Sequence, residues 1–148
     1  MKDNKKRGFT LIELLVVISI IGLLSTISVV ALNGARKKGR DAKRIGDIKQ
    51  IQTALELYFN DNYAYPVEVA AVTLGATGQL ALCTGGFAAD CSGVKTYMGI
   101  VPANPTPGGA AYTYAISTGD TYSITFTLEE NTGGLAAGAY TASPNGIN

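Results

Sequence analysis

The sequence Gly8-Phe9-Thr10-Leu11-Ile12-Glu13, with the apolar run that continues to Leu32, is the most informative part of this chain. Between Phe9 and Leu32 the only residue with a formal charge is Glu13. A helix rises about 1.5 Å per residue, so these 24 residues reach roughly 36 Å, more than the hydrocarbon core of about 30 Å. The sequence therefore predicts a membrane-inserted helix.

A short basic segment, residues 1–8, precedes the apolar run. It carries four Lys or Arg residues and one Asp, and it ends at Gly8. A secretory signal peptide has a shorter apolar region and is cut on its far side. Here the small residue that suits cleavage lies on the near side, so cleavage after Gly8 would remove the leader and leave the helix attached.

A carboxylate in a membrane helix needs a physical reason, because at the helix centre it costs about 2.5 to 3.5 kcal/mol on insertion scales. One interpretation is that Glu13 lies near the headgroups, where its carboxyl group is protonated or extends toward them. The other interpretation is that the carboxylate pairs with a cation. Cleavage after Gly8 would make Phe9 the new amino terminus, one helical turn from Glu13. The amine and the carboxylate would then pair within one subunit or between neighbours, and a pair between neighbours would set the axial stagger of the subunits.

These residues together resemble the processing and assembly signature of type IV pilins and of the pseudopilins of type II secretion. The resemblance rests on the basic leader ending in Gly8, on Phe9, Thr10 and Glu13, and on the uninterrupted run 14–18. It implies that a prepilin peptidase cuts between Gly8 and Phe9 and methylates the new amino terminus of Phe9. It also implies that Glu13, in an assembly segment that includes Thr10, contacts a neighbouring subunit.

The resemblance further implies partners and a location. The partners are other copies of this chain, the prepilin peptidase and methyltransferase, and an inner-membrane assembly platform with its assembly ATPase. Membrane lipid surrounds the helix before assembly, and DNA or a host surface would be bound by the finished filament. The precursor would be a single-pass protein of the cytoplasmic membrane with its head outside, and the product an extracellular or cell-surface filament.

Basic residues also follow the apolar run, and their placement conflicts with this orientation. Six of them lie beyond it, against four in the leader: Arg36, Lys37, Lys38, Arg40, Lys43 and Arg44. The positive-inside tendency alone would put this side in the cytoplasm. We follow the resemblance, because the leader has a function only where its peptidase acts. The favoured interpretation is a solvated face or a partner for acidic groups of adjacent subunits, with lipid phosphate or DNA as the alternative.

From Asp41 to about Asn60 the apolar residues recur on one side only, which is typical of an amphipathic helix that covers a core. The stripe consists of Ile45, Ile48, Ile51, Leu55 and Tyr58 or Phe59. The residues 60–62 and Pro66 predict the end of this helix, since Asn and Asp favour turns and proline disfavours helix in the residue before it. The segment 49–66 also resembles the second half of the long pilin helix, most closely that of major pseudopilins.

The last third of the chain predicts an antiparallel sheet. Alternating residues at 112–117 and 122–128, separated by residues 118–121, predict a hairpin. Residues 138–142 are a third candidate strand and 94–98 a weaker fourth, whereas 67–81 is expected to connect helix and sheet with at most a short helical turn. One apolar face of this sheet on the helical stripe gives a two-layer α+β head, the pilin fold.

The predicted organisation is a leader at 1–8, a transmembrane assembly helix at 9–32, an amphipathic helix at 33–62 and a β-rich head at 63–148. Cys83 and Cys91 are the only cysteines. In a chain that resembles an exported protein they are expected to form a disulfide, worth about 2 to 3 kcal/mol by loop-closure estimates. Free thiols would be expected if the head stayed in the cytosol.

Catalysis is not predicted. The chain has no histidine and no recognisable nucleophile–base set or phosphate-binding glycine loop, and Glu129-Glu130 is interpreted as a solvated turn. We predict no catalytic residue, no cofactor and no metal site. A calcium site built from Asp120, Glu129 or Asp90, in a region where some relatives bind calcium, is a minor alternative.

The sequence therefore favours a structural subunit of a type IV pilus, cut after Gly8 and polymerised through its N-terminal helix for adhesion, twitching motility or DNA uptake. The alternative within the family is a major pseudopilin of a type II secretion system. The alternative from another class is a single-pass anchored extracellular binding domain that does not polymerise.

Overall fold

The structure, a computed structural model, describes residues 9–118 and 120–148, so the predicted leader and Gly8 lie outside the described residues. Residue contacts divide the chain into two compact units, Met1–Arg36 and Lys37–Asn148, which are described separately. The elements in chain order are α1 (Leu11–Asn62), β1 (Val72–Thr73), β2 (Ala81–Cys83), β3 (Gly86–Ala88), β4 (Thr96–Met98), β5 (Thr113–Thr118), β6 (Thr121–Leu128), β7 (Gly138–Ser143) and β8 (Gly146–Ile147).

In the first unit, α1 exposes all of its apolar side chains. Every Leu, Ile and Val between Leu11 and Leu32 is exposed, as is the ring of Phe9. The hydroxyls of Ser19, Ser25 and Ser28 donate hydrogen bonds to carbonyl oxygens four residues earlier, so these polar atoms are satisfied inside the helix. Among the described residues, α1 is the one helix long and apolar enough to cross a membrane.

In the second unit, the C-terminal part of α1 buries one side against the sheet. Ile48, Ile51 and Leu55 are fully buried, as the apolar stripe predicted. The helix ends at Asn62, also as predicted. Tyr63 follows with a φ of 55°, a left-handed conformation that closes many helices, and its N–H donates to the carbonyl of Phe59 at 2.7 Å.

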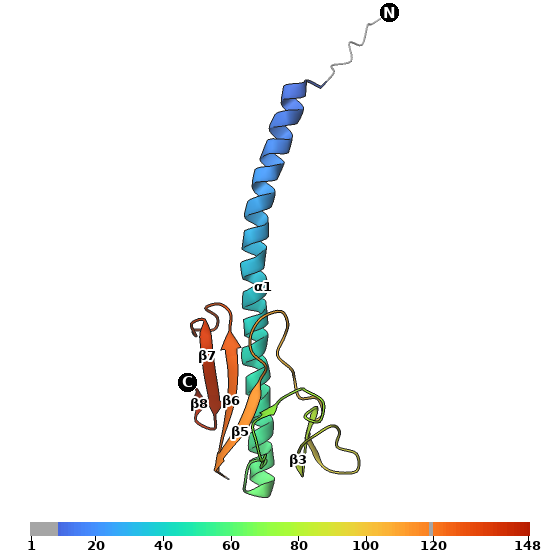
Figure 1. Cartoon of the computed structure of the whole chain (residues 1–148), viewed down its shortest axis with the longest axis vertical. Coiled ribbons are helices and arrows are strands. Elements are labelled where there is room, and N and C mark those ends of the chain that lie inside the picture. The colour runs from blue at the N-terminus through green and yellow to red at the C-terminus, as the bar shows by residue number, and fades with distance from the viewer. Residues whose placement is uncertain (1–8, 119) are drawn as a thin grey trace, which may run out of the picture. The chain divides into compact units, whose positions relative to one another are not determined.

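The larger sheet has five antiparallel strands in the order β1-β5-β6-β7-β8. Strands β5 and β6 form the predicted hairpin, with Tyr114 opposite Ile124, and β7 pairs with β6 as the third strand. Figure 1 shows β5 to β8 beside the part of α1 that belongs to the second unit. The buried face of the sheet includes Tyr112, Tyr114 and Tyr122. These three rings are part of the hydrophobic core.

A second, three-stranded sheet in the order β3-β2-β4 was only partly predicted. Strand β4 corresponds to the weaker candidate at 94–98, while β2 and β3 were missed. The connection 67–81 has no helical turn among its residues; it contains β1, which pairs with β5 at Val72 and Thr73. The result is a helix packed on antiparallel sheets, so the α+β fold class is confirmed.

Candidate functional site

The N-terminus of α1 is closed by a reciprocal pair of side chains, Thr10 and Glu13. The backbone N–H and the hydroxyl of Thr10 both donate to Oε2 of Glu13, at 2.8 and 2.7 Å. The N–H of Glu13 donates to the Thr10 hydroxyl at 3.3 Å. This arrangement is a capping box, which satisfies backbone N–H groups that the first helical turn leaves without partners.

The capping box places three predicted site residues together at one end of an apolar rod. Phe9 precedes Thr10 directly and its ring is 81% exposed. Within the described part of the chain Glu13 has no ion pair, so its pairing with the amine of Phe9 stays a prediction. A Thr three residues before a Glu at a helix start is the sequence signal that identifies a capping box.

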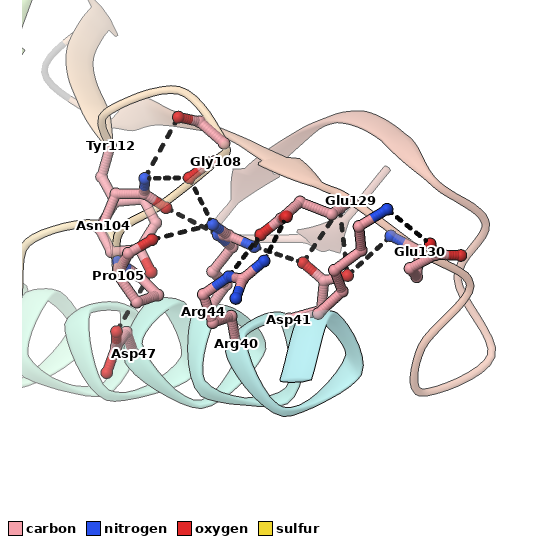
Figure 2. Close-up of polar contacts among 12 residues, drawn as sticks. Arg40, Asp41, Arg44, Asp47, Asn104, Pro105, Gly108, Tyr112, Glu129 and Glu130 are labelled. Carbon is pink, nitrogen blue, oxygen red and sulfur yellow. Dashed lines mark hydrogen bonds and ion pairs between the residues drawn. The ribbon is translucent and has the colours of Figure 1, made fainter. Parts of the chain in front are cut away.

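The head is joined to α1 by a buried arginine. The side chain of Arg44 has no exposed surface, and its N–H groups donate to oxygens from three segments (Figure 2). These oxygens are Asn104 Oδ1 at 2.7 Å, Asp41 Oδ1 and Glu129 Oε1 at 2.6 Å each, the Pro105 carbonyl at 3.0 Å and the Gly108 carbonyl at 2.5 Å. Because all five hydrogen-bond partners of the guanidinium are acceptors, the desolvation cost of burying its charge is offset locally.

The two carboxylates that contact Arg44 also accept hydrogen bonds from other donors. Asp41, also without exposed surface, accepts hydrogen bonds from the backbone N–H groups of Glu129 and Glu130 at 2.8 to 3.1 Å. Glu129 accepts two parallel bonds from Arg40, at 2.8 and 2.6 Å. The hydrogen bonds from Arg40, followed by those from Arg44, lower the pKa of Glu129 to about 2. We call Arg40, Asp41, Arg44 and Glu129 the helix–sheet clamp.

Two glycines allow the loop after Pro105 to reach the clamp. Gly108 and Gly109 have φ values of +84° and +74°. A Cβ on Gly108 would lie 2.6 Å from the carboxylate of Glu129, and one on Gly109 would lie 2.8 Å from the guanidinium of Arg44. Both the backbone conformation and the close approach therefore require glycine here.

The clamp corrects two predictions. The basic cluster is not simply a solvated face, because Arg40, Arg44 and Lys37 have carboxylate partners in the same chain; Lys37 pairs with Glu130 at 3.1 Å. The acidic pair 129–130 is not a solvated turn, since it supplies these partners. Both oxygens of Glu129 face cations, and no group of three metal-binding side chains gathers among the described residues.

A second group of contacts between the helix and the head lies near the C-terminus of α1. Cys83 and Cys91 form a disulfide, the pairing predicted from the sequence. Next to it, the hydroxyl of Tyr58 donates to the carbonyl of Thr84 at 3.1 Å, and Lys95 forms an ion pair with Asp61. The small sheet is thus tied to the helix through polar contacts as well as through the core.

Comparisons with known proteins point to one family. The profile described as the prokaryotic N-terminal methylation motif matches residues 3–29. The chain is 44% identical over 63 residues to the type II secretion system core protein G of Escherichia coli (strain K12). The aligned region covers 43% of this chain and 43% of that relative. The chain is 40% identical over 65 residues to the protein of the same name from Vibrio cholerae serotype O1, 44% of each chain.

These matches cover less than half of this chain and less than half of each relative. No solved structure matches. The methylation motif and the similarity to core protein G agree with the fold described above, a long N-terminal helix packed against antiparallel sheets. Over the matched residues the chain is therefore similar to core protein G of type II secretion and carries the prokaryotic N-terminal methylation motif.

Proposed function

We propose that this chain is the structural subunit of a type II secretion pseudopilus. Its precursor is held in the membrane by α1, is cut between Gly8 and Phe9, and is methylated at the amino group of Phe9. The observation that carries the proposal is the similarity to core protein G of this secretion system in several bacteria. The comparisons thus favour the secretion alternative over the surface pilus that the sequence analysis preferred.

The exposed apolar surface of the first unit supports polymerisation. Side chains such as Leu11, Leu23 and Val30 are 81%, 63% and 74% exposed, and a surface of this kind requires apolar surroundings at every stage. Lipid supplies them for the precursor, and neighbouring copies of α1 supply them in a filament. Because lipid tails are as apolar as leucine, this exchange gives little net hydrophobic energy, and specific contacts must choose the packing.

Glu13 provides such a specific contact. One of its oxygens is held by Thr10, which fixes the carboxylate at the tip of the helix. Its other oxygen, Oε1, accepts no hydrogen bond from any described residue. In the filament we assign this oxygen to the methylated amine of Phe9 on a neighbouring copy, in surroundings of low dielectric where the attraction is strong.

The helix–sheet clamp serves the same function by holding the head on α1. A subunit that is drawn from the membrane into a filament must keep its head attached to the helix that moves. The buried ion pairs of Arg44 with Asp41 and Glu129 resist separation, because exposing one partner leaves the other charge buried. The assembly platform, its ATPase and the peptidase are the partners that this function requires.

The test is complementation of a strain that lacks core protein G. We expect this chain to restore secretion of a reporter protein, and the mature chain to begin at Phe9 with one added methyl group by mass spectrometry. The positive control is the same strain complemented with its own core protein G. Long surface fibres of this chain without rescue of secretion would instead make it a pilus subunit, and a product that retains residues 1–8 would contradict the processing step.

A further inference from the structure

We propose that Arg36, Lys38 and Lys43 form a contact of α1 with the phosphate groups of anionic phospholipids, at the membrane surface where the apolar run of the helix ends. This inference rests on insertion of the apolar helix into a membrane and not on the secretion function. It concerns the precursor before assembly, when lipid surrounds the helix.

The ion pairs of the head separate the six cations beyond Leu32 into two groups. Lys37, Arg40 and Arg44 are neutralised by carboxylates of the same chain. The other three, Arg36, Lys38 and Lys43, are exposed and have no ion pair among the described residues. Lys43 also attracts the carboxylate of Asp47 on the same helix, so it is less available than Arg36 and Lys38 to a partner outside the chain.

Their position along α1 matches the headgroup layer. Arg36 and Lys38 follow Leu32 by four and six residues, about 6 and 9 Å at 1.5 Å per residue. The headgroup region on each side of the hydrocarbon core is about 5 to 8 Å thick, and Lys and Arg side chains extend toward it. Lys43 lies about 16 Å from Leu32. It is therefore roughly one Debye length, about 8 Å, further from the membrane than Lys38, and its attraction to the lipid phosphates would be weaker.

The head does not compete for these cations. Arg40, Arg44 and Ile48 mark the side of α1 that contacts the sheet and its loops. At 100° per residue, Lys38 and Lys43 lie on other sides of the same helix, consistent with their exposure. They can therefore approach phosphates while the clamp stays closed.

Lipid is favoured over an acidic surface of a second copy or a nucleic acid by two features. The three cations follow a membrane-spanning run directly, so phosphates surround them wherever the helix is inserted. The contact also accounts for the conflict with the positive-inside tendency: half of the cluster is neutralised by the head, and the other half binds the anionic surface on the side where the head lies.

The experiment measures the lipid selectivity of the full chain reconstituted in phosphatidylcholine bilayers. Electron spin resonance of spin-labelled phosphatidylglycerol and phosphatidylcholine gives the relative association of each lipid with the protein. The test variants are Lys38→Gln and the double variant Arg36→Gln/Lys38→Gln. The matched control is Lys49→Gln, which removes an exposed cation without an ion pair among the described residues, on the same helix but about 25 Å beyond Leu32.

We expect the wild-type chain to prefer phosphatidylglycerol, and the double variant to lose roughly two- to five-fold of this preference. Lys38→Gln should give an intermediate value and Lys49→Gln the wild-type value. The leader is present in every variant, so its own cations cancel in the comparison. Raising the salt concentration should weaken the preference of the wild type.

Equal preferences in all variants would overturn the proposal, and so would a loss of preference in Lys49→Gln as large as in Lys38→Gln. Crosslinks between copies that depend on Lys38, without lipid selectivity, would assign the cations to a second copy and overturn it too.

Discussion

Replacing Arg44 by methionine removes the centre of the helix–sheet clamp while keeping an apolar side chain of similar length. The variant loses all five hydrogen bonds that the guanidinium donates. Asp41 remains charged and buried with only the backbone N–H groups of Glu129 and Glu130 as donors. The carbonyls of Pro105 and Gly108 lose a donor as well.

The magnitude follows from this inventory. Removing one partner of a buried ion pair costs about 3 to 5 kcal/mol, because the other charge is left uncompensated. A typical domain has only about 5 to 15 kcal/mol of stability. With a urea dependence of about 1 to 3 kcal/mol per molar, we expect the unfolding midpoint of Arg44→Met to fall by roughly 2 M.

The assay is equilibrium urea unfolding of Lys37–Asn148, the compact unit that contains the whole clamp, followed by far-ultraviolet circular dichroism. The matched control is Lys37→Met, which breaks an ion pair whose partners are 45% and 38% exposed and should cost at most about 1 kcal/mol. The double variant Asp41→Leu/Arg44→Met should lose less than the sum of its single changes, since no charge is left buried. A loss below about 1 kcal/mol for Arg44→Met would refute the importance assigned to the clamp.

Three further outcomes are expected. The folded-state pKa of Glu129, about 2, lies below its ordinary value of 4.5, so its contribution to stability is present above pH 4.5 and is lost as the pH falls toward 2; thermal unfolding against pH should show a weaker acid dependence in Glu129→Gln. Changing both Cys83 and Cys91 to serine should lower the free energy of unfolding by about 2 to 3 kcal/mol in urea, and no change would mean that the loop is already ordered without the bond. Gly109→Ala should lower the melting temperature more than Gly134→Ala, because both have positive φ but only the first new Cβ meets the Arg44 guanidinium; equal losses would leave backbone conformation as the only cause.

The elements that a repeating pattern specifies could be predicted from the sequence. The apolar run, the stripe at three- and four-residue steps and the alternating strands 112–117 and 122–128 each carry a period that matches their structure. Strands β2 and β3 have only three residues each, too few for a period. Their conformation depends on pairing with each other and with β4, which only the folded chain brings together.

The clamp was missed because charged residues were assigned to solvent by type. Asp41 and Arg44 continue the spacing of Ile48 and Ile51 toward the N-terminus, so the buried side of the helix extends to them. Glu129 directly follows the buried end of β6, where a carboxylate can reach that side. The positions were therefore available as a signal, but the choice between burial and solvation depends on partners that are about 85 residues apart in the chain.

The proposed contact of Glu13 between copies of this chain can be examined with the variant Glu13→Gln. This change keeps the size of the side chain and an oxygen that can accept from Thr10, but it removes the charge that would pair with the amine of Phe9. In cells that carry the secretion machinery, the measurement is the amount of sedimentable filament per unit of processed subunit. We predict a loss of at least ten-fold, about 1.4 kcal/mol per contact or more, with processing at Phe9 unchanged. Filaments at the wild-type level from fully processed Glu13→Gln subunits would contradict the account.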